Sequence, residues 1–472
     1  MGSLLMLLAT TMAGCAAVAL FFGGSDFFAF LASALITVLI GLWLLYFGRG
    51  GEKKFSRRDG YLTITLSWLL FALVGTLPFL LSGQITNFTD AFFESMSSFT
   101  TTGCTVIGDT ESIPRAILLW RCIGQWLGGL GIVFFTVAVL PMFGFSGVQL
   151  FAAEATGYMK KKANPRVAIT ARWILTVYIS LTVLCTLSLW LCGMHPFEAI
   201  CHGLTTISTG GFSTRNESIA SFHSVSIEWV LVFFMFVGGI NYTLIYLSFV
   251  KGKFRDLLRS SEFHWYLFIV LFFTAVITGG LVERDDRDFF TALSDAIFMV
   301  VSTQTTTGFA CTNYSTWQPW VWMILGFSMY FGGMGGSSSG AMKSSRVAIF
   351  SKSIAAEFRR ILHPNAVLPV RMDGMVISSS TRTTVLTFVC LYVLLVLFGW
   401  LLFIICGLDF SNSYGLSLCC LGNVGIIVPG ISCVGLPFAV KWICSFLMLV
   451  GRLELFSVLL VLTPTFWREG NF

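Results

Sequence analysis

Charged side chains are scarce in this sequence. Of its 472 residues, only 11% are Asp, Glu, Lys or Arg, whereas a typical soluble domain has roughly 25%. The hydrophobic share is 56%, and the mean hydropathy is +0.83. These values exclude an ordinary water-soluble protein and predict an all-α protein that crosses a membrane many times.

The sequence also lacks the side-chain groupings that most enzymes need. Its 13 cysteines are scattered, mostly in apolar runs, without a C-x-x-C pair or a Cys/His set at metal-ligand spacing. His202 has no nearby nucleophile or second ligand, and the acids stand in loops or begin short helices. The spans carry no Asp/Glu/His series that would relay protons. We therefore expect neither an enzyme nor an organic cofactor.

Ten apolar runs reach the length needed to cross a bilayer, about 20 residues. They are Leu4 to Phe22, Phe27 to Tyr46, Tyr61 to Leu81, Ile117 to Met142, Val167 to Cys192, Ile227 to Val250, Trp265 to Val282, Trp320 to Ala341, Thr383 to Cys406 and Phe438 to Leu462.

The basic residues predict the orientation of these spans, because Lys and Arg in short loops are retained in the cytoplasm. With the N-terminus inside, twenty of them fall in inner loops and five in outer loops. The inner ones are Arg49, Lys53, Lys54, Arg57, Arg58, Lys160, Lys161, Lys162, Arg166, Arg172, Lys251, Lys253, Arg255, Arg259, Lys343, Arg346, Lys352, Arg359, Arg360 and Arg371. Both termini are therefore predicted to be cytoplasmic, and the net charge of +6 gives no reason to expect nucleic acid.

One sequence pattern occurs three times. It begins with an acid and Ala, continues with a short apolar stretch, and ends with Thr/Ser-rich residues before a Gly. The copies are DAFFESMSSFTTTG from Asp90, EAICHGLTTISTGG from Glu198 and DAIFMVVSTQTTTG from Asp295, and the acid and last Gly are thirteen residues apart in each. A degenerate fourth copy, NSYGLSLCCLGNVG, extends from Asn412 to Gly425. Each copy lies between two spans on the predicted outer side. The unit is therefore a span, a short re-entrant helix with a loop, and a second span.

Four such units follow the first two spans. We predict a two-helix unit at residues 1–60 and pore repeats at residues 61–150, 151–260, 261–372 and 373–472, with pseudo-fourfold symmetry around a pore. Irregular backbone at membrane depth is tolerated only where protein, water or ions satisfy it. The four loops are therefore expected to converge on one axis around a shared cation.

The residue types in these loops favour a potassium ion as that cation. Rings of backbone carbonyls replace its hydration shell in potassium filters, glycine permits the necessary backbone conformations, and threonine hydroxyls add oxygens or brace the loop. A single TTTG is more simply a polar loop, but copies in register favour a filter. In the second loop, Gly211 rather than Gly210 aligns with Gly308, because Phe follows both. The predicted potassium-binding residues are Thr101, Thr102, Gly103, Thr209, Gly210, Gly211, Thr306, Thr307, Gly308, Asn423, Val424 and Gly425.

The stretch FGGMGGSSSGAMK, residues 331–343, interrupts the second span of the third repeat. Its glycines and serines disfavour a helix, since each Gly costs about 1 kcal/mol relative to Ala. Close helix packing through small residues is the simpler explanation, but glycines here are consecutive, at 332/333 and 335/336. We predict a gate loop below the filter, containing Gly332, Gly333, Gly335, Gly336 and Gly340.

Arg452 lies deep in the last predicted span, where a charge is costly and usually faces a partner or a watery cavity. One interpretation is an ion pair with Glu454 or another acid, although residues two apart on a helix do not face each other. The other is that Arg452 projects into the cytoplasmic half of the pore and opposes cations as part of the gate. Polar residues expected to brace the filter by hydrogen bonds are Glu94, Gln125, His202, Asn241 and Asn423.

At these motifs the chain resembles the Trk/Ktr/HKT superfamily of potassium transporters, most closely its bacterial TrkH type. The matching stretches include FTDAFFESMSSFTTTGCTV, LLWRCIGQWLGGLGIV, TTISTGGFST, FVGGINYTLIY, TTTGFA and GRLELF. The resemblance implies a bacterial inner-membrane protein, a homodimer with one pore per protomer, and a cytosolic nucleotide-binding regulatory subunit of the TrkA type. In that superfamily, glycine at all four filter positions goes with a preference for potassium over sodium. Two departures are Cys104 after the first filter glycine and the sequence NVGIIVPG in the fourth loop.

The leading hypothesis is potassium uptake through a channel-like pore, and the alternative is a symporter that couples potassium to proton or sodium. Membrane lipid is an expected partner. The stretch FSKSIAAEFRRIL, residues 350–362, has apolar side chains at helical spacing opposite charges. This pattern is typical of a helix on the bilayer surface, and docking of a regulatory subunit is the alternative.

Overall fold

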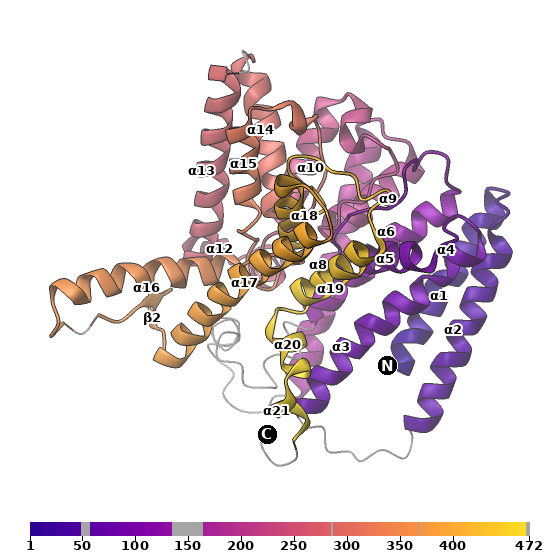
Figure 1. Cartoon of the computed structure of the whole chain (residues 1–472), viewed down its shortest axis with the longest axis horizontal. Helices are drawn as coiled ribbons and strands as arrows, with labels where there is room; N and C mark the ends of the chain where they lie inside the picture. Colours follow the sequence, from indigo (N-terminus) through magenta and orange to yellow (C-terminus); the bar gives the residue numbers. More distant parts are fainter. Residues whose placement is uncertain (49–56, 135–163, 285–286, 367, 469–472) are drawn as a thin grey trace.

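The computed structural model describes residues 1–48, 57–134, 164–284, 287–366 and 368–468. This part of the chain is almost entirely helical, as predicted, and its first and last helices have their free ends on the same side of the molecule (Figure 1). Some basic residues used to predict topology lie outside the described residues: Arg49, Lys53, Lys54, Lys160, Lys161 and Lys162.

A pair of helices, α1 (Gly2–Phe21) and α2 (Phe27–Gly48), precedes the repeats, and α1 packs against α6. The first repeat consists of α3 (Arg57–Gly75), α4 (Leu77–Leu81), α5 (Phe88–Phe99) and α6 (Arg115–Phe134). The second consists of α8 (Asn164–Leu191), α9 (Pro196–Ile207), the 3-10 helix η3 (Ser218–Phe222), α10 (Val225–Gly238), α11 (Tyr242–Phe249) and α12 (Phe254–Arg259).

The third repeat consists of α13 (Ser261–Arg284), α14 (Phe289–Gln304), the 3-10 helix η4 (Tyr314–Thr316), α15 (Pro319–Ser328) and α16 (Ser344–Leu362). A small antiparallel hairpin follows, with β1 (Arg371–Met372) paired to β2 (Met375–Val376). The fourth repeat consists of α17 (Ser379–Ile405), α18 (Phe410–Gly422), α19 (Phe438–Arg452), α20 (Phe456–Leu462) and α21 (Pro464–Trp467).

Six helical spans in the described part are long and apolar enough to cross a membrane, and two bent helix pairs raise this number to eight. The prediction of ten also counted α6 and α15. The span predicted around α6 extends beyond residue 134, outside the described residues. Helix α15 has only ten residues because the glycine-rich segment begins shortly after it.

Two spans predicted as continuous are in fact broken. Helices α10 and α11 are bent by 103°; α10 ends at Gly238, and Asn241 caps α11 by accepting from the backbone N–H of Thr243. Helices α19 and α20 meet at 119°, where Glu454 and Leu455 have positive φ angles of 57° and 25°. Such conformations cannot continue a right-handed helix, so the last span breaks between α19 and α20.

The short re-entrant helices α5, α9, α14 and α18 each begin with a side-chain cap. Asn87, His195, Asp288 and Asp409 accept a hydrogen bond from the backbone N–H two residues later, which satisfies a donor that a helix start leaves unpaired. The predicted acid-Ala start lies within the first turn of α5 and α9, whereas α14 begins one turn earlier. Capping thus fixes where each chain segment turns back into the membrane.

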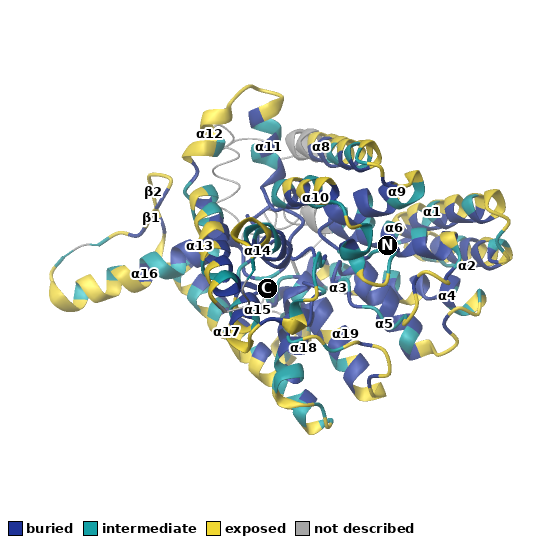
Figure 2. Ribbon diagram, turned by 90° about the horizontal axis from the view of Figure 1, so that it is seen from above, coloured by how far each residue is buried: buried dark blue, intermediate teal, exposed yellow. Residues whose placement is uncertain are grey.

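The repeats interlock around the centre of the molecule. The second span of one repeat packs against the short helix of the next, as α6 does on α9 and α10 on α14, and α19 of the last repeat returns to α5 of the first. Buried residues gather at this centre, and exposed residues lie on outer helices such as α2 and α16 (Figure 2). This cyclic packing brings the short helices α5, α9, α14 and α18 together from distant parts of the sequence.

Candidate filter and gate

Each short helix is followed by a loop with the same backbone conformation. Gly103, Gly211, Gly308 and Gly425 have φ angles of 85°, 77°, 86° and 88°. Two residues before them, Thr101, Thr209, Thr306 and Asn423 have φ angles of 52°, 52°, 58° and 53°. Gly211, and not Gly210, has the conformation of the other three glycines. The fourth, degenerate loop therefore has the backbone geometry of the three regular ones.

These four glycines close a ring by contacting one loop after the next. A Cβ atom on Gly103 would lie 2.3 Å from the carbonyl oxygen of Gly210, and one on Gly211 would lie 1.8 Å from that of Thr307. A Cβ on Gly308 would meet the Val424 carbonyl oxygen at 2.1 Å, and one on Gly425 would meet that of Thr102 at 2.5 Å. Real Cβ atoms do not approach oxygen so closely, so each position requires glycine. All twelve predicted filter residues belong to this ring of loops.

Side-chain hydroxyls hold the loops from within. Thr100 and Thr102 share a hydrogen bond of 2.8 Å, and Thr305 and Thr307 share an equivalent one of 2.7 Å. In the fourth loop the Asn423 side chain donates to the Thr102 hydroxyl at 3.0 Å and to the backbone of α19. The threonine side chains therefore brace the loops through one another, one of the two roles that the sequence suggested for them.

Gln125 of α6 clamps the second loop. Its side-chain nitrogen donates to the Gly210 carbonyl at 2.6 Å, and its side-chain oxygen accepts from the Phe212 backbone N–H at 3.1 Å. His202, also expected to brace the loops, lies between the Glu198 carbonyl at 2.8 Å and the Ser213 hydroxyl at 3.0 Å. Both side chains thus make the structural hydrogen bonds expected of them.

An ion pair behind the first loop was not foreseen from the sequence. Arg121 donates from Nε to Glu94 at 2.7 Å, and both side chains are buried. Glu94 also accepts from the Thr105 hydroxyl and the Val106 backbone N–H, and the Arg121 guanidinium lies 4.2 Å from the Phe212 ring centroid. A charge in the middle of an apolar run is the signal that could have identified Arg121, as it identified Arg452.

The glycine-rich segment from Gly332 to Gly340 crosses directly beneath these loops. The Gly340 backbone N–H donates to the Thr306 hydroxyl at 2.7 Å, and the Ser338 hydroxyl donates to the Ile207 carbonyl at the end of α9. A Cβ on Gly340 would lie 2.4 Å from the Gly422 carbonyl oxygen at the end of α18. The segment therefore touches the ends of α9 and α18 and the loop that follows α14.

Two charged residues that the sequence analysis did not assign to the gate, Glu262 and Lys343, bind this segment. Glu262, at the start of α13, accepts from the Gly335 backbone N–H at 2.7 Å and from that of Ser345 at 3.1 Å. Lys343 donates to the carbonyl of Ser339. Both side chains are buried, so their hydrogen bonds compensate for the loss of water.

Arg452 is 2% exposed, and the proposed ion pair with Glu454 is wrong. Arg452 instead donates from Nη1 to the Ser338 carbonyl at 2.7 Å and from Nη2 to the Gly128 carbonyl of α6 at 3.0 Å. Glu454 pairs with Arg346 of α16. The break between α19 and α20 turns the two charges of the GRLELF motif toward different partners, so Arg452 ties the glycine-rich segment to α6.

The model of the TrkH family, described as a cation transport protein, matches residues 27–468. The chain belongs to the TrkH family. It is 36% identical over 478 residues to the Trk system potassium uptake protein TrkH of Vibrio parahaemolyticus, covering 99% of this chain and 98% of that protein. The same protein of Escherichia coli K12 is 36% identical over 479 residues, with the same coverage.

A solved structure agrees with this assignment. The crystal structure of the potassium transporter TrkH from Vibrio parahaemolyticus matches with a TM-score of 0.92 and 33% identity, and the match covers 99% of this chain and 98% of that chain. The TrkH fold inferred from sequence motifs is thereby confirmed, and as a cation transport protein the chain is not an enzyme. Ion binding at individual residues and the boundaries of the repeats stay predictions.

The departures from the usual TrkH pattern lie together in the structure. The Cys104 sulfur is 3.4 Å from that of Cys419, a residue of α18 in the fourth repeat, and 3.9 Å from the Gly425 carbonyl oxygen. The unusual residue of the first loop therefore packs against the unusual fourth repeat. Both cysteines are buried, so they fill core space between the two repeats.

The amphipathic stretch forms the C-terminal part of α16, which projects from the body of the molecule (Figure 1). Its apolar side chains are exposed: Ile354, Phe358, Ile361 and Leu362. An apolar face of this kind is typical of contact with lipid or with another protein.

Proposed function

We propose that this protein carries potassium ions into a bacterial cell across the inner membrane, through a channel-like pore whose filter is formed by the four loops. The observation that carries the proposal is the closed ring in which each filter glycine packs on a carbonyl of the next loop. Potassium would be held by oxygens of residues 101–103, 209–211, 306–308 and 423–425, which replace its water shell. Potassium uptake is also the activity in the names of the relatives from Vibrio parahaemolyticus and Escherichia coli.

The segment from Gly332 to Gly340 would act as the gate of this pore. It lies under three of the four short helices, and Arg452 fastens it to α6. In this arrangement the guanidinium charge also opposes a cation that leaves the filter. Opening then requires Arg452 to release the Ser338 carbonyl, so that the segment can swing away from the axis.

The proposed assembly is a homodimer, with a cytosolic nucleotide-binding subunit of the TrkA type on the side that carries both chain ends. The twenty basic residues assigned to that side support a cytoplasmic orientation. The Glu454–Arg346 ion pair links the break after α19 to the start of α16. A subunit that moves α16 would therefore act on the segment next to the gate.

Ion flux into liposomes tests the proposal. Uptake of potassium, rubidium, sodium and lithium is compared, with and without an imposed pH gradient. We expect potassium and rubidium to enter much faster than sodium and lithium, at rates that do not depend on the pH gradient. Uptake that requires a proton or sodium gradient would favour the symporter over the channel. Equal uptake of all four ions would refute the proposed selectivity filter.

A further inference from the structure

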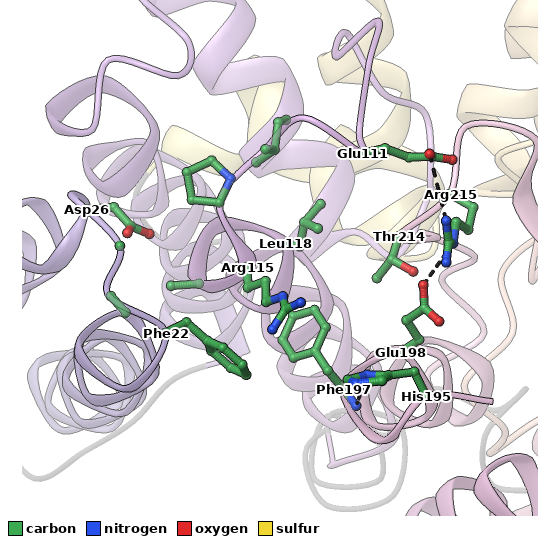
Figure 3. Close-up of a pocket in the computed structure, with 15 residues that line it drawn as sticks. Phe22, Asp26, Glu111, Arg115, Leu118, His195, Phe197, Glu198, Thr214 and Arg215 are labelled. Atoms are coloured by element: carbon green, nitrogen blue, oxygen red, sulfur yellow. Dashed lines mark hydrogen bonds and ion pairs between the residues drawn. The ribbon is translucent and has the colours of Figure 1, made fainter. Parts of the chain in front are cut away.

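A cavity of about 660 Å³ lies between the N-terminal helix pair and the pore repeats, on the side opposite the chain ends. It is bounded by the turn between α1 and α2, by the start of α6 and by the start of α9 (Figure 3). Its volume is in the range of ligand-binding pockets. The proposed potassium pathway does not use it.

Two buried polar side chains face this cavity without a partner among the described residues. Asp26 is 2% exposed, and neither of its carboxylate oxygens accepts a hydrogen bond. The Thr214 hydroxyl, 5% exposed, is also unpaired. Buried polar groups are nearly always hydrogen-bonded, because loss of water is otherwise uncompensated. Both groups line the same cavity, which points to a ligand that they share.

Asp26 is not explained by a role at the start of α2. It directly precedes the helix, where an Asp side chain commonly accepts from the backbone N–H groups of the first turn. Neither oxygen makes that bond, and the carboxylate instead lies against Gly24, where an added Cβ would be 2.3 Å from Oδ1. The cavity thus has one carboxylate without a partner among the described residues.

Arg115 supplies the opposite charge. Its guanidinium stacks 4.5 Å from the ring centroid of Phe22 and 5.8 Å from that of Phe197, and it makes no hydrogen bond or ion pair within the described part of the chain. Figure 3 shows it in the middle of the cavity, with Asp26 to one side. The five N–H donors of this residue suit an anion such as phosphate.

The other charged side chains of the cavity, two carboxylates and one guanidinium, form one ion-paired group. Arg215 pairs with Glu198 at 2.8 Å and lies 3.8 Å from Glu111, as the dashed lines in Figure 3 show. A bare cation would meet Arg115, and a bare anion would meet Asp26. The charge pattern therefore matches a zwitterion with an ammonium and a phosphate group.

We propose that this cavity binds the phosphoethanolamine headgroup of a membrane lipid, with its ammonium on Asp26 and its phosphate on Arg115 and Thr214. The location of the cavity favours a membrane lipid as the ligand, because the cavity lies at the turn between two apolar helices. The flanking side chains Phe21 and Phe28 are 82% and 76% exposed, so acyl chains can extend along the α1 and α2 surface. The lipid would seal the junction between the helix pair and the pore repeats.

Native mass spectrometry of the full-length protein tests the site. Delipidated protein is mixed with equal amounts of phosphatidylethanolamine, phosphatidylcholine and phosphatidylglycerol with identical acyl chains. We expect the first bound lipid to be phosphatidylethanolamine in about tenfold excess, because choline has no N–H to donate to Asp26 and glycerol has no cation. Equal occupancy by the three lipids would overturn the proposal.

Variants separate the two ends of the headgroup. Asp26→Asn is expected to abolish the preference for ethanolamine over choline, whereas Arg115→Gln should lower binding of all three lipids at the first site about tenfold. Glu217→Gln, at an exposed position on the same side, removes a charge outside the cavity and should change nothing. An unchanged preference in Asp26→Asn, or unchanged first-site binding in Arg115→Gln, would overturn the site.

Soluble glycerophosphoethanolamine identifies the source of the headgroup. We expect it to raise the melting temperature of the delipidated protein far less than the intact lipid does. Equal stabilisation would overturn the lipid assignment in favour of a free zwitterion. The melting temperatures of Asp26→Asn and Arg115→Gln without ligand show in the same experiment that the variants fold.

Discussion

The filter loops and the segment from Gly332 to Gly340 are both glycine-rich backbone buried in the middle of the protein, but they are held differently. Each filter loop repeats the same pair of positive φ angles and packs on the next loop through backbone atoms. The glycine-rich segment is held largely by side chains of distant helices, above all Arg452 and Glu262. Backbone in a closed ring can move only if the ring deforms, whereas side-chain hydrogen bonds can be exchanged one at a time. This difference fits the proposed roles, the filter loops in ion selection and the glycine-rich segment as a gate.

The largest effect is expected from Gly103→Ala. The new Cβ would lie 2.3 Å from the Gly210 carbonyl oxygen, at a φ angle of 85° that Ala rarely adopts. We expect rubidium uptake by proteoliposomes to fall by more than about tenfold. Gly108→Ala is the matched control, because its nearest atom, on Val434, is 3.8 Å away. Equal uptake by the two variants would contradict a closed ring.

Arg452→Gln should have the next largest effect, in the opposite direction. The change removes two charged hydrogen bonds to the Ser338 and Gly128 carbonyls, each of which contributes about 1.5–3 kcal/mol. We expect potassium flux in the absence of other subunits to rise about tenfold or less. Arg468→Gln, exposed after α21, should leave flux unchanged. A folded Arg452→Gln protein with normal flux would show that Arg452 does not hold a gate.

Glu262→Ala should loosen the same segment more mildly. It leaves the backbone N–H groups of Gly335 and Ser345 without their acceptor, which costs about 1–3 kcal/mol. The expected results are a lower melting temperature and a small increase in leak. Glu262→Gln keeps an acceptor oxygen and should restore most of the stability, and Glu283→Ala, exposed near the other end of α13, controls for the loss of an acid. Identical behaviour of the Ala and Gln variants would refute a role as acceptor.

The smallest effect is expected from Gln125→Leu, which alters one of the filter loops. The second loop loses its clamp on Gly210 and Phe212 but keeps its ring contacts. We expect the ratio of potassium to sodium uptake to fall a few-fold, with total flux nearly preserved. Gln304→Leu, which removes one longer bond of 3.3 Å to the Tyr266 carbonyl, should change the ratio less. A larger change from Gln304→Leu would contradict the clamp.

The repeats could be predicted from sequence because their spacing is set by the geometry of one structural unit. The unit recurs four times with one spacing, so a glycine lies thirteen residues after an acid in three copies and after Asn412 in the fourth. The same spacing identified Gly425 as the filter glycine of the fourth loop, although the two residues before it, Asn423 and Val424, replace the threonines of the other loops. Backbone conformation there depends on the glycine, and Asn tolerates the positive φ angle two residues earlier.

The partners of the buried charges could not be predicted. Arg452 and Glu454 are close in sequence, but the turn between α19 and α20 sends Arg452 to Ser338 and Glu454 to Arg346. Likewise Glu262 reaches Gly335 across 73 positions of the chain. Sequence shows that a charge in an apolar run must be satisfied, but not by which group.

The sequence by itself determined that the chain crosses a membrane, that it is built from four related units, and that glycine recurs at one position in each. These features follow from hydropathy, charge placement and local backbone preference, which act over short stretches of chain. Only the tertiary structure decided that the loops close a ring, that Arg452 grips two carbonyls, and that Asp26 and Arg115 face one cavity. Such contacts join residues far apart in the chain, and they exist only once the helices have packed.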